Sequence, residues 1–160
     1  MISIDPVSAV LALVLFGAFT VPFIYHFQKN KQKEKQLSLK LLDVGKTAGA
    51  KPDLIETWRN QYALGLDTPK KVLLYLSEGE ANNSFCIPLS EVKKVTVLIK
   101  TKEIGELKKP VVEHVGLEIY FTSPTKKSII LEIFNEEQFS DLMGETVLAE
   151  KWAESIKKLL

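Results

Sequence analysis

Few residues of this 160-residue chain combine the types and the spacing that catalysis or metal binding requires. His26 and His114 lie far apart in the sequence, and neither has a second ligand at metal-binding spacing. Glu113 precedes His114 and could exchange a proton with it, but no nucleophile or orienting third group accompanies the pair. We therefore predict that Glu113 and His114 form a surface pair on a hairpin, and that the chain binds no metal and is not an enzyme.

Two other segments resemble functional motifs without meeting their requirements. Gly45-Lys46-Thr47 matches the end of a phosphate-binding loop, but that loop needs a first glycine five residues earlier, where this chain has Lys40. A helix C-terminus is the better interpretation. Cys86 lies between two apolar residues and has no basic neighbour to activate its thiol, so we expect it to be buried and inert. The sequence thus predicts no cofactor.

The densest mixture of aromatic and polar side chains is Trp58-Arg59-Asn60 together with Tyr62. Such mixtures are common at protein-binding surfaces, because aromatic rings supply contact area and polar groups supply direction. Trp58 is also suited to closing a hydrophobic core, and we favour the core for it. We predict a partner surface formed by Trp58, Arg59, Asn60 and Tyr62, for which another protein is the expected occupant.

The charge of the chain limits its other partners. A formal net charge of +1 argues against a general nucleic-acid binder. Lysines occur in pairs at predicted strand ends and turns: Lys70/Lys71, Lys93/Lys94, Lys108/Lys109 and Lys126/Lys127. Such pairs are typical of solvated loops and protected sheet edges, and the alternative is that they bind anionic lipid headgroups.

The element that determines the location of the protein comes first in the chain. Val7–Phe27 contain no Asp, Glu, Lys or Arg, and a helix of that length is about 31 Å long, which matches the hydrocarbon core of a bilayer. Asp5 and Pro6 suit the start of this helix, and Pro22 should kink it or end its regular part. A cleaved signal peptide would carry positive charge before the apolar run, and a soluble core helix would keep a polar face. We therefore predict a transmembrane helix over residues 7–27.

A basic segment follows the apolar run. Residues 28–40 carry one glutamate and five lysines, namely Lys29, Lys31, Lys33, Lys35 and Lys40. By the positive-inside rule this flank is cytoplasmic, which leaves residues 1–6 outside and the C-terminal part inside. We expect residues 28–50 to form a helical stalk at the membrane surface, with Leu37, Leu41 and Val44 as an apolar stripe that docks on another surface.

Residues 51–160 show the two-residue periodicity of β-strands and end in a helix. We predict six strands, at residues 58–66, 72–76, 85–87, 95–99, 115–121 and 129–133. Asn135 and Gln138 resemble a capping box for a short helical piece that reaches Met143. An amphipathic C-terminal helix follows, and its apolar face consists of Leu148, Trp152, Ile156 and Leu159.

These elements resemble a pleckstrin-homology-like domain over Trp58–Leu160. The likeness rests on antiparallel strands in meander order, a long excursion at Lys102–Pro110 and a terminal helix that turns Trp152 toward the sheet. It implies an α+β fold in which a partly open barrel is closed by the C-terminal helix, and in such folds basic loops at one end can bind anionic headgroups. The whole layout looks like that of small uncharacterised bacterial single-pass membrane proteins.

Together these features predict a single-pass protein of the cell inner membrane. Its cytoplasmic α+β domain, residues 51–160, would act as a binding or scaffolding module for a partner that the sequence does not identify. One alternative is an accessory subunit of a membrane enzyme or transporter, and another is a domain that binds anionic lipid headgroups. Ser8, Ala12 and Gly17 permit close approach of two membrane helices and weakly favour a homodimer.

Overall fold

The computed structural model describes residues 5–79, 83–104 and 109–160. The chain divides into two compact units, Met1–Gln36 and Leu37–Leu160. The first helix, α1, spans Pro6–Lys46, so it supplies nearly all of the described first unit and continues into the second. Pro22 lies inside this helix, and the helix continues through it rather than ending there.

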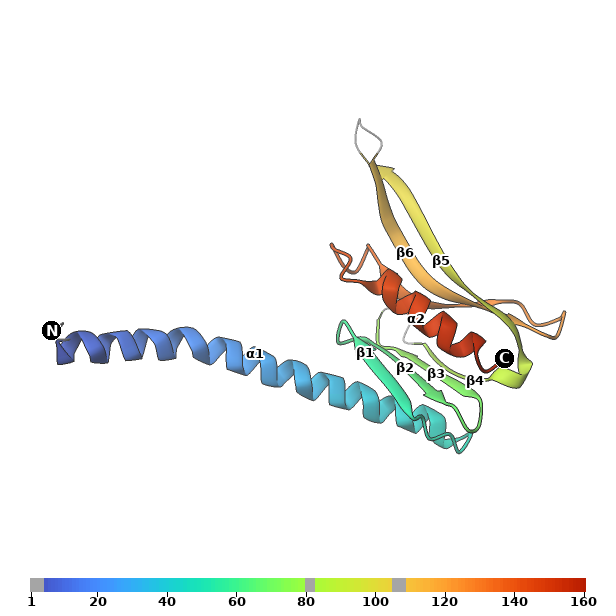
Figure 1. Ribbon diagram of the computed structural model, residues 1–160, viewed down its shortest axis with the longest axis horizontal. Coiled ribbons are helices and arrows are strands. Elements are labelled where there is room, and N and C mark those ends of the chain that lie inside the picture. The colour runs from blue at the N-terminus through green and yellow to red at the C-terminus, as the bar shows by residue number, and fades with distance from the viewer. Residues whose placement is uncertain (1–4, 80–82, 105–108) are drawn as a thin grey trace. The chain divides into compact units, whose positions relative to one another are not determined.

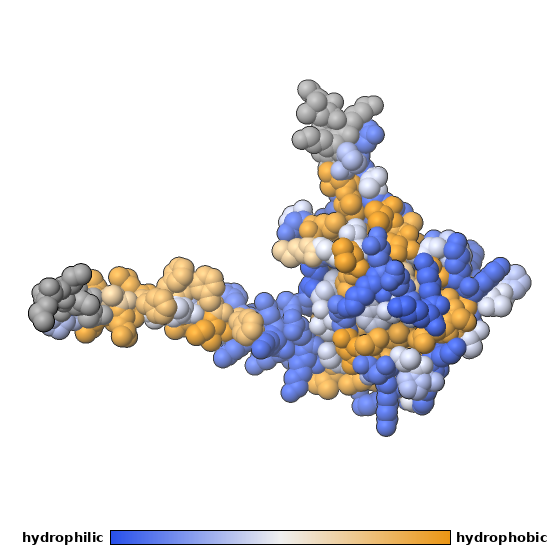
Figure 2. Space-filling view, viewed as in Figure 1, coloured by the Kyte–Doolittle hydropathy of each residue, from blue (hydrophilic) through white to orange (hydrophobic). Residues whose placement is uncertain are grey.

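In the first unit the large apolar side chains of α1 lie exposed. This holds for every large apolar side chain described between Val7 and Phe27. Figure 2 shows this stretch as hydrophobic and the next stretch of the helix as hydrophilic. The helix is long enough and apolar enough to cross a membrane. A helix of this length that is apolar all round is a candidate membrane span.

Across the described part of the second unit, seven strands form two antiparallel sheets, and a helix ends the chain (Figure 1). The first sheet has the order β1-β2-β3-β4, with β1 at Leu54–Trp58, β2 at Tyr62–Asp67, β3 at Val72–Ser77 and β4 at Ser84–Pro88. A 3-10 turn at Leu89–Glu91 leads to the second sheet, with β5 at Val92–Ile104, β6 at Lys109–Phe121 and β7 at Ile129–Asn135. Helix α2 spans Glu145–Lys157. The predicted α+β class with antiparallel sheet is confirmed, and the described strands form two sheets without closing into a barrel.

The prediction of six strands was wrong at one turn. The strand expected over residues 58–66 is a hairpin, in which Trp58 of β1 pairs with Tyr62 of β2. Arg59 and Asn60 in the turn have φ angles of 53° and 52°, the left-handed region that tight hairpin turns need. Arginine is uncommon in that region, so the turn carried a weak sequence signal.

The short helical piece predicted between Asn135 and Met143 does not form. The Asn135 side chain does act as a cap, since its oxygen accepts the backbone N–H of Glu137 at 3.1 Å. Only one turn follows, in which the N–H of Phe139 donates to the carbonyl of Asn135 at 3.1 Å. The capping signal was therefore real, but it closes a turn after β7 and starts no helix.

The excursion expected at Lys102–Pro110 is shorter than predicted. Residues 102–104 pair with residues 109–111 as the continuation of β5 and β6. The tip between them, which includes Lys108, lies outside the described residues.

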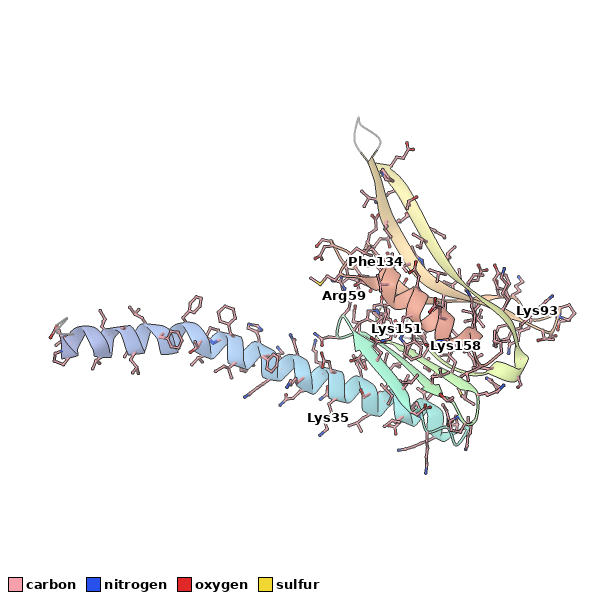
Figure 3. All side chains as sticks on the ribbon, in the orientation of Figure 1. Lys35, Arg59, Lys93, Phe134, Lys151 and Lys158 are labelled. Atoms are coloured by element: carbon pink, nitrogen blue, oxygen red, sulfur yellow. The ribbon has the colours of Figure 1, made fainter. Side chains whose placement is uncertain are left out.

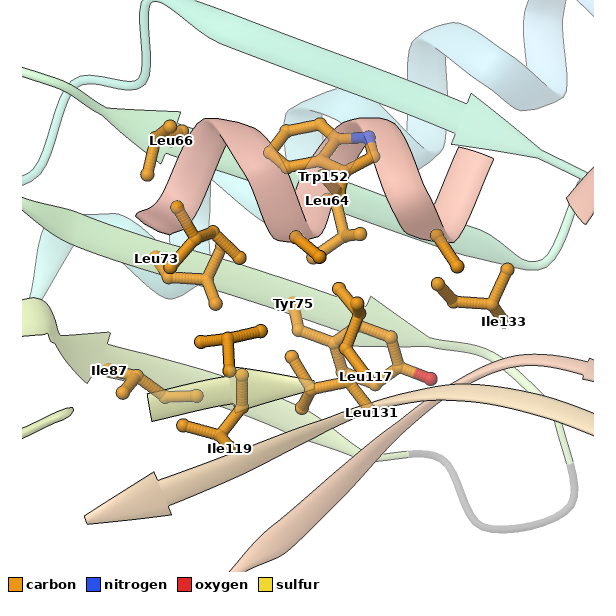
Figure 4. Packing of buried hydrophobic residues seen from close by; sticks show 14 of the residues in the cluster. Leu64, Leu66, Leu73, Tyr75, Ile87, Leu117, Ile119, Leu131, Ile133 and Trp152 are labelled. Carbon is orange, nitrogen blue, oxygen red and sulfur yellow. The ribbon is translucent and has the colours of Figure 1, made fainter. Parts of the chain in front are cut away.

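The main core lies between the two sheets and is covered by α2 (Figure 4). Leu64, Leu66, Leu73 and Tyr75 from the first sheet meet Leu117, Ile119, Leu131 and Ile133 from the second. Trp152 and Ile156 of α2 are buried in this core, and Leu148 and Leu159 pack against it. The predicted apolar face of the C-terminal helix is therefore confirmed, including the direction of Trp152.

A second core covers the opposite face of the first sheet. Leu37 and Leu41, from the last turns of α1, are buried there with Ala63 and Leu74. Strands β2 and β3 are consequently buried on both faces, which explains why they read as nearly continuous apolar runs. Gly65 permits this contact, because a Cβ atom at its position would lie 2.9 Å from a methyl carbon of Leu41. The predicted docking of the apolar stripe is confirmed.

Candidate functional site

Arg59 ties the turn between β1 and β2 to the start of α2. Its Nε donates to Oε1 of Glu145 at 2.5 Å, and its Nη2 donates to the backbone carbonyl of Asp141 at 2.5 Å. The guanidinium lies 4.8 Å from the centre of the Phe139 ring, and Figure 3 shows Phe134 beside it. Only 12% of the Arg59 side chain and 5% of the Glu145 side chain are exposed. These contacts stabilise the left-handed backbone of Arg59.

Glu56 holds the middle of β1 against α2. Its Oε2 accepts hydrogen bonds from Nε1 of Trp152 and from Nζ of Lys151, each at 2.8 Å. Glu56 pairs with Leu64 across the sheet, so both side chains lie on the face that carries the main core. Glu56 and Arg59 together fix α2 alongside β1.

A groove lies between β1 and one face of α2. Its larger part has a volume of about 440 Å³ and is lined by Glu56, Trp58, Arg59, Met143, Gly144, Glu145, Val147, Leu148 and Lys151. A further part of about 200 Å³ is lined by Leu54, Ile55, Glu56, Lys151, Trp152 and Ser155. The two parts share Glu56 and Lys151, so the groove follows β1 over its whole length.

Strand β1 gives this groove an open backbone edge. It is the outer strand of its sheet, and among the described strands it pairs with β2 alone. Apolar side chains beside the edge are exposed, to 48% for Leu54, 66% for Val147 and 73% for Met143. An open strand edge next to exposed apolar side chains can accept another extended chain segment.

The four residues of the predicted partner surface separate in the structure. Trp58 and Arg59 line the groove, and Asn60 lies half-buried in the turn. Tyr62 is fully buried in the main core, so its assignment to a surface was wrong. Trp58 contributes to the groove and also packs against the main core. The centres of its ring and the Tyr62 ring are 5.4 Å apart, and its Nε1 donates to the carbonyl of Ile133 at 2.8 Å.

A second group of polar side chains lies around Glu132 of β7. The Glu132 carboxylate accepts the Tyr62 hydroxyl at 2.7 Å, and its Oε2 lies 3.4 Å from Nε2 of His114. Hydrogen bonding to His114 lowers the pKa of Glu132, although burial acts in the opposite direction. The Tyr75 hydroxyl donates to the backbone carbonyl of Glu132 at 2.8 Å, and burial raises the pKa of Tyr75. The acidic neighbour of His114 is thus Glu132 rather than the predicted Glu113.

Three of the four predicted lysine pairs gather at one end of the second unit. The N–H of Leu89 donates to the carbonyl of Lys71 at 2.8 Å, and the N–H of Thr122 donates to that of Glu91 at 2.8 Å. Val92 pairs with Phe121, and Nζ of Lys71 reaches the carbonyl of Leu159 at 2.8 Å. We call this region the basic end; its lysines are Lys70, Lys71, Lys93, Lys94, Lys126, Lys127, Lys157 and Lys158. Figure 3 labels two of them, Lys93 and Lys158.

The lysines of the predicted stalk divide between the two units. Lys29, Lys31, Lys33 and Lys35 lie exposed on α1 in the first unit, where Nζ of Lys31 lies 4.6 Å from the centre of the Phe27 ring. Lys40 belongs to the second unit and forms an ion pair with Glu78. Cys86 is half-buried rather than fully buried as expected, and burial raises the pKa of its thiol. Gly45-Lys46-Thr47 includes the C-terminal end of α1, as predicted.

The sequence did not indicate several residues that build these sites. Glu56, Lys151 and Glu145 were not singled out, because single charged residues at exposed-looking positions are common. Glu56 is 96 residues from Trp152, and Arg59 is 86 residues from Glu145. Pairing over such separations follows from the tertiary fold and from no local pattern. One weak signal existed, since Glu56 is a charged residue on the same face of its strand as Leu54 and Trp58.

No protein-family model matches this chain, and no match was found among curated proteins or among solved structures.

Proposed function

We propose that this protein is a membrane-anchored binding module, with no catalytic role of its own, that holds an extended segment of a partner protein in the groove between β1 and α2. The observation that carries this proposal is the open edge of β1 beside the exposed apolar side chains of Val147 and Met143. A segment that adds to a sheet edge gains backbone hydrogen bonds, and its alternate side chains enter the adjoining groove.

The charges in the groove favour a neutral, apolar segment. Glu56 is bonded to Lys151 and Trp152, and Arg59 is bonded to Glu145 and Asp141. A charged partner would have to compete with these pairs, and a buried charge without its own partner is costly. Leu54, Val147 and Met143 remain available for apolar contact. The proposed occupant is therefore an extended protein segment with apolar residues at alternate positions.

The first unit supports the membrane anchor in this proposal. The large apolar side chains of α1 between Val7 and Phe27 lie exposed, and the hydrocarbon core of a bilayer would cover them. The lysines after Phe27 favour an N-terminus outside the inner membrane of a bacterial cell and a second unit in the cytoplasm. The seven described strands followed by α2 also agree with a pleckstrin-homology-like domain, a fold that commonly serves in binding.

Peptide selection tests the groove directly. The full chain, purified in mild detergent, is used to select binders from a library of random ten-residue peptides displayed on phage. We expect the selected peptides to carry apolar residues at alternate positions. Val147→Glu should weaken their binding by about tenfold or more, because it places a charge in the apolar part of the groove. The matched control is Leu39→Glu, a change to an apolar residue of α1 in the second unit that is 52% exposed and lines neither part of the groove.

Backbone pairing is tested on the same peptides. Methylating the backbone nitrogens that face β1 should abolish binding, whereas methylating the alternate nitrogens should preserve it, because only one set of N–H groups faces the neighbouring strand. Peptides that bind equally well to the Val147→Glu variant, or that tolerate methylation at every position, would contradict this assignment of the groove.

The anchor and its orientation have their own test. We expect the full chain to stay with the membrane fraction after washing at high pH. We also expect a C-terminal tag to resist external protease in intact cells and to become accessible after lysis. Cleavage of the tag in intact cells would contradict the proposed orientation.

An accessory subunit of a membrane enzyme or transporter would use the same groove, and it would be recognised by crosslinking from Val147 to the same stoichiometric partner in every preparation.

The basic end favours a second candidate function, the binding of anionic lipid headgroups. Its lysines come from four separate segments that backbone and side-chain contacts bring together. Each lysine near an anionic surface contributes about 1 kcal/mol. The full chain in lipid nanodiscs tests this: hydrogen exchange at residues 122–128 should slow when phosphatidylserine replaces part of a neutral lipid. Equal exchange in both lipids would contradict this candidate.

A further inference from the structure

A polar pocket lies between the two sheets, apart from the groove. It has a volume of about 220 Å³ and is lined by Tyr75, Ser77, Asn83, Lys100, His114, Ile130 and Glu132. These residues come from β3, from Asn83 directly before β4, and from all three strands of the other sheet. The pocket is smaller than the roughly 300–1,000 Å³ that drug-sized ligands occupy. Its size and lining point to a small polar ligand.

His114 is incompletely bonded in this pocket. Its Nε2 faces Oε2 of Glu132 at 3.4 Å, which directs a proton to that nitrogen. Its Nδ1 is buried and has no hydrogen-bond partner among the described residues. A buried polar atom without a partner costs free energy, and such atoms occur where a ligand or water completes the bonding.

Lys100 supplies a positive charge at the same pocket. It is the cross-strand neighbour of His114, and it forms no ion pair within the part of the chain that the structure describes. Glu132, the acid of the pocket, accepts hydrogen bonds from Tyr62 at 2.7 Å and from Asn135 at 3.3 Å. Its negative charge is therefore already stabilised by two hydrogen bonds, whereas no ion pair holds the Lys100 ammonium among the described residues.

Two uncharged side chains, Ser77 and Asn83, complete the polar lining of the pocket. Ser77 is buried, and its Oγ accepts the N–H of Gly79 at 3.4 Å. Its hydroxyl is also within hydrogen-bonding reach of Tyr75, from which it can turn to donate to a ligand. Asn83 is held beside it, because its carbonyl accepts the N–H of Ser77 at 2.8 Å. Side-chain amide and hydroxyl donors next to an ammonium are the groups that bind carboxylate and phosphate oxygens.

We propose that this pocket binds a small oxyanion, a phosphate or carboxylate group. The Lys100 ammonium neutralises the anion, Ser77 and Asn83 donate hydrogen bonds to it, and the bound anion draws a proton onto Nδ1 of His114. Tyr75 and Glu132, the other titratable groups that line the pocket, form its floor: the Tyr75 hydroxyl is bonded to the carbonyl of Glu132, and the Glu132 carboxylate faces Nε2.

Nitrogen NMR of the histidine side chains tests the pocket in the full chain. The protein, labelled with ¹⁵N-histidine and kept in neutral detergent micelles, is titrated with sodium phosphate and separately with sodium acetate, against sodium chloride at equal ionic strength. We expect phosphate, acetate or both to shift the Nδ1 signal of His114 saturably toward the protonated form. His26 lies in the first unit and serves as the internal control, since its signals should not move.

Two charge variants separate pocket binding from general attraction. Lys100→Gln should weaken anion binding by about tenfold or more, because it removes the charge-assisted contact. Lys102→Gln is the matched control, since Lys102 is on the same strand but forms an ion pair with Glu136, does not line the pocket and does not belong to the basic end. Tryptophan fluorescence confirms that both variants are folded. Equal weakening by the two variants, or no saturable shift with either anion, would overturn the proposal.

The source of the oxyanion is decided by a lipid arm of the same experiment. Micelles that contain phosphatidic acid and no free phosphate should produce the His114 shift only if the pocket takes a lipid-borne phosphate. A shift with free phosphate or acetate alone assigns a soluble ligand. The groove is tested independently, because Val147→Glu should leave the anion titration unchanged whether or not it affects peptide binding.

Discussion

Helix α1 contains leucines in two opposite environments. Leu15 lies exposed in the first unit, whereas Leu41, in the second unit, is fully buried against the first sheet. Charged residues differ in the same way, since Lys35 is exposed and Arg59 is bonded to Glu145 and Asp141. The large apolar side chains of the first unit between Val7 and Phe27 are exposed, whereas the second unit buries most of its large apolar side chains in two cores of its own.

The largest effect is expected where the second unit buries a charge pair. Arg59→Ala leaves Glu145 buried without its partner, which should lower the free energy of unfolding by about 3–5 kcal/mol. Both tryptophans of the chain, Trp58 and Trp152, lie in the second unit, so denaturant unfolding followed by their fluorescence reports that unit alone. Lys35→Ala is the control from the first unit, and it should change the free energy by less than about 0.5 kcal/mol.

The next-largest loss of stability is expected in the second core. Leu41→Ala removes a fully buried side chain that packs between α1 and the first sheet, and it should cost about 2–5 kcal/mol in the same measurement. Leu15→Ala, a chemically identical change on the same helix, should leave the unfolding of the second unit unaffected. Equal losses from the two changes would contradict the division of the helix at residue 36.

Gly65 and Gly17 differ in the space around them in the same way. At Gly65 an added Cβ would lie 2.9 Å from Cδ2 of Leu41 and 3.2 Å from Cβ of Pro52. Gly65→Ala should therefore destabilise the second unit by about 1–3 kcal/mol through overpacking. At Gly17 a Cβ would meet nothing within 4 Å, so Gly17→Ala should leave the second unit unchanged. A neutral Gly65→Ala would mean that the end of α1 does not pack closely on the sheet.

The fold was largely predictable, because repeating patterns produced most of it. Strands β5, β6 and β7 follow alternating apolar residues, and the apolar face of α2 repeats at helical spacing. The sequence was misleading where the backbone conformation depends on a single residue. The turn at Arg59 has an unusual residue in a left-handed conformation, and its strain is offset by contacts with residues far along the chain. Local periodicity contains no information about those contacts.

The candidate sites were less predictable than the fold for the same reason. Arg59 was singled out, but its partner Glu145 lies 86 residues later. The pocket around His114 depends on Glu132, which belongs to the next strand, whereas the sequence suggested the adjacent Glu113. Neighbours across a sheet depend on strand order and register, and those follow from the packing of the whole domain.

The smallest effect concerns pH and Glu132. Its pKa in the folded protein is lowered from 4.5, so its contacts add stability above that value, and this stability is lost as the pH falls through the lower folded pKa. Below about pH 4.5 the second unit should therefore lose about 1 kcal/mol, the size of one net hydrogen bond. Glu132→Gln should remove this part of the pH dependence, because its amide does not titrate.

The control is Glu34→Gln, which changes an exposed glutamate of the first unit. It should leave the pH profile of tryptophan-detected unfolding as in the original protein. If Glu132→Gln left the profile unchanged as well, the Glu132 carboxylate would not be bonded as described, and the contrast between the two units would not extend to this charge.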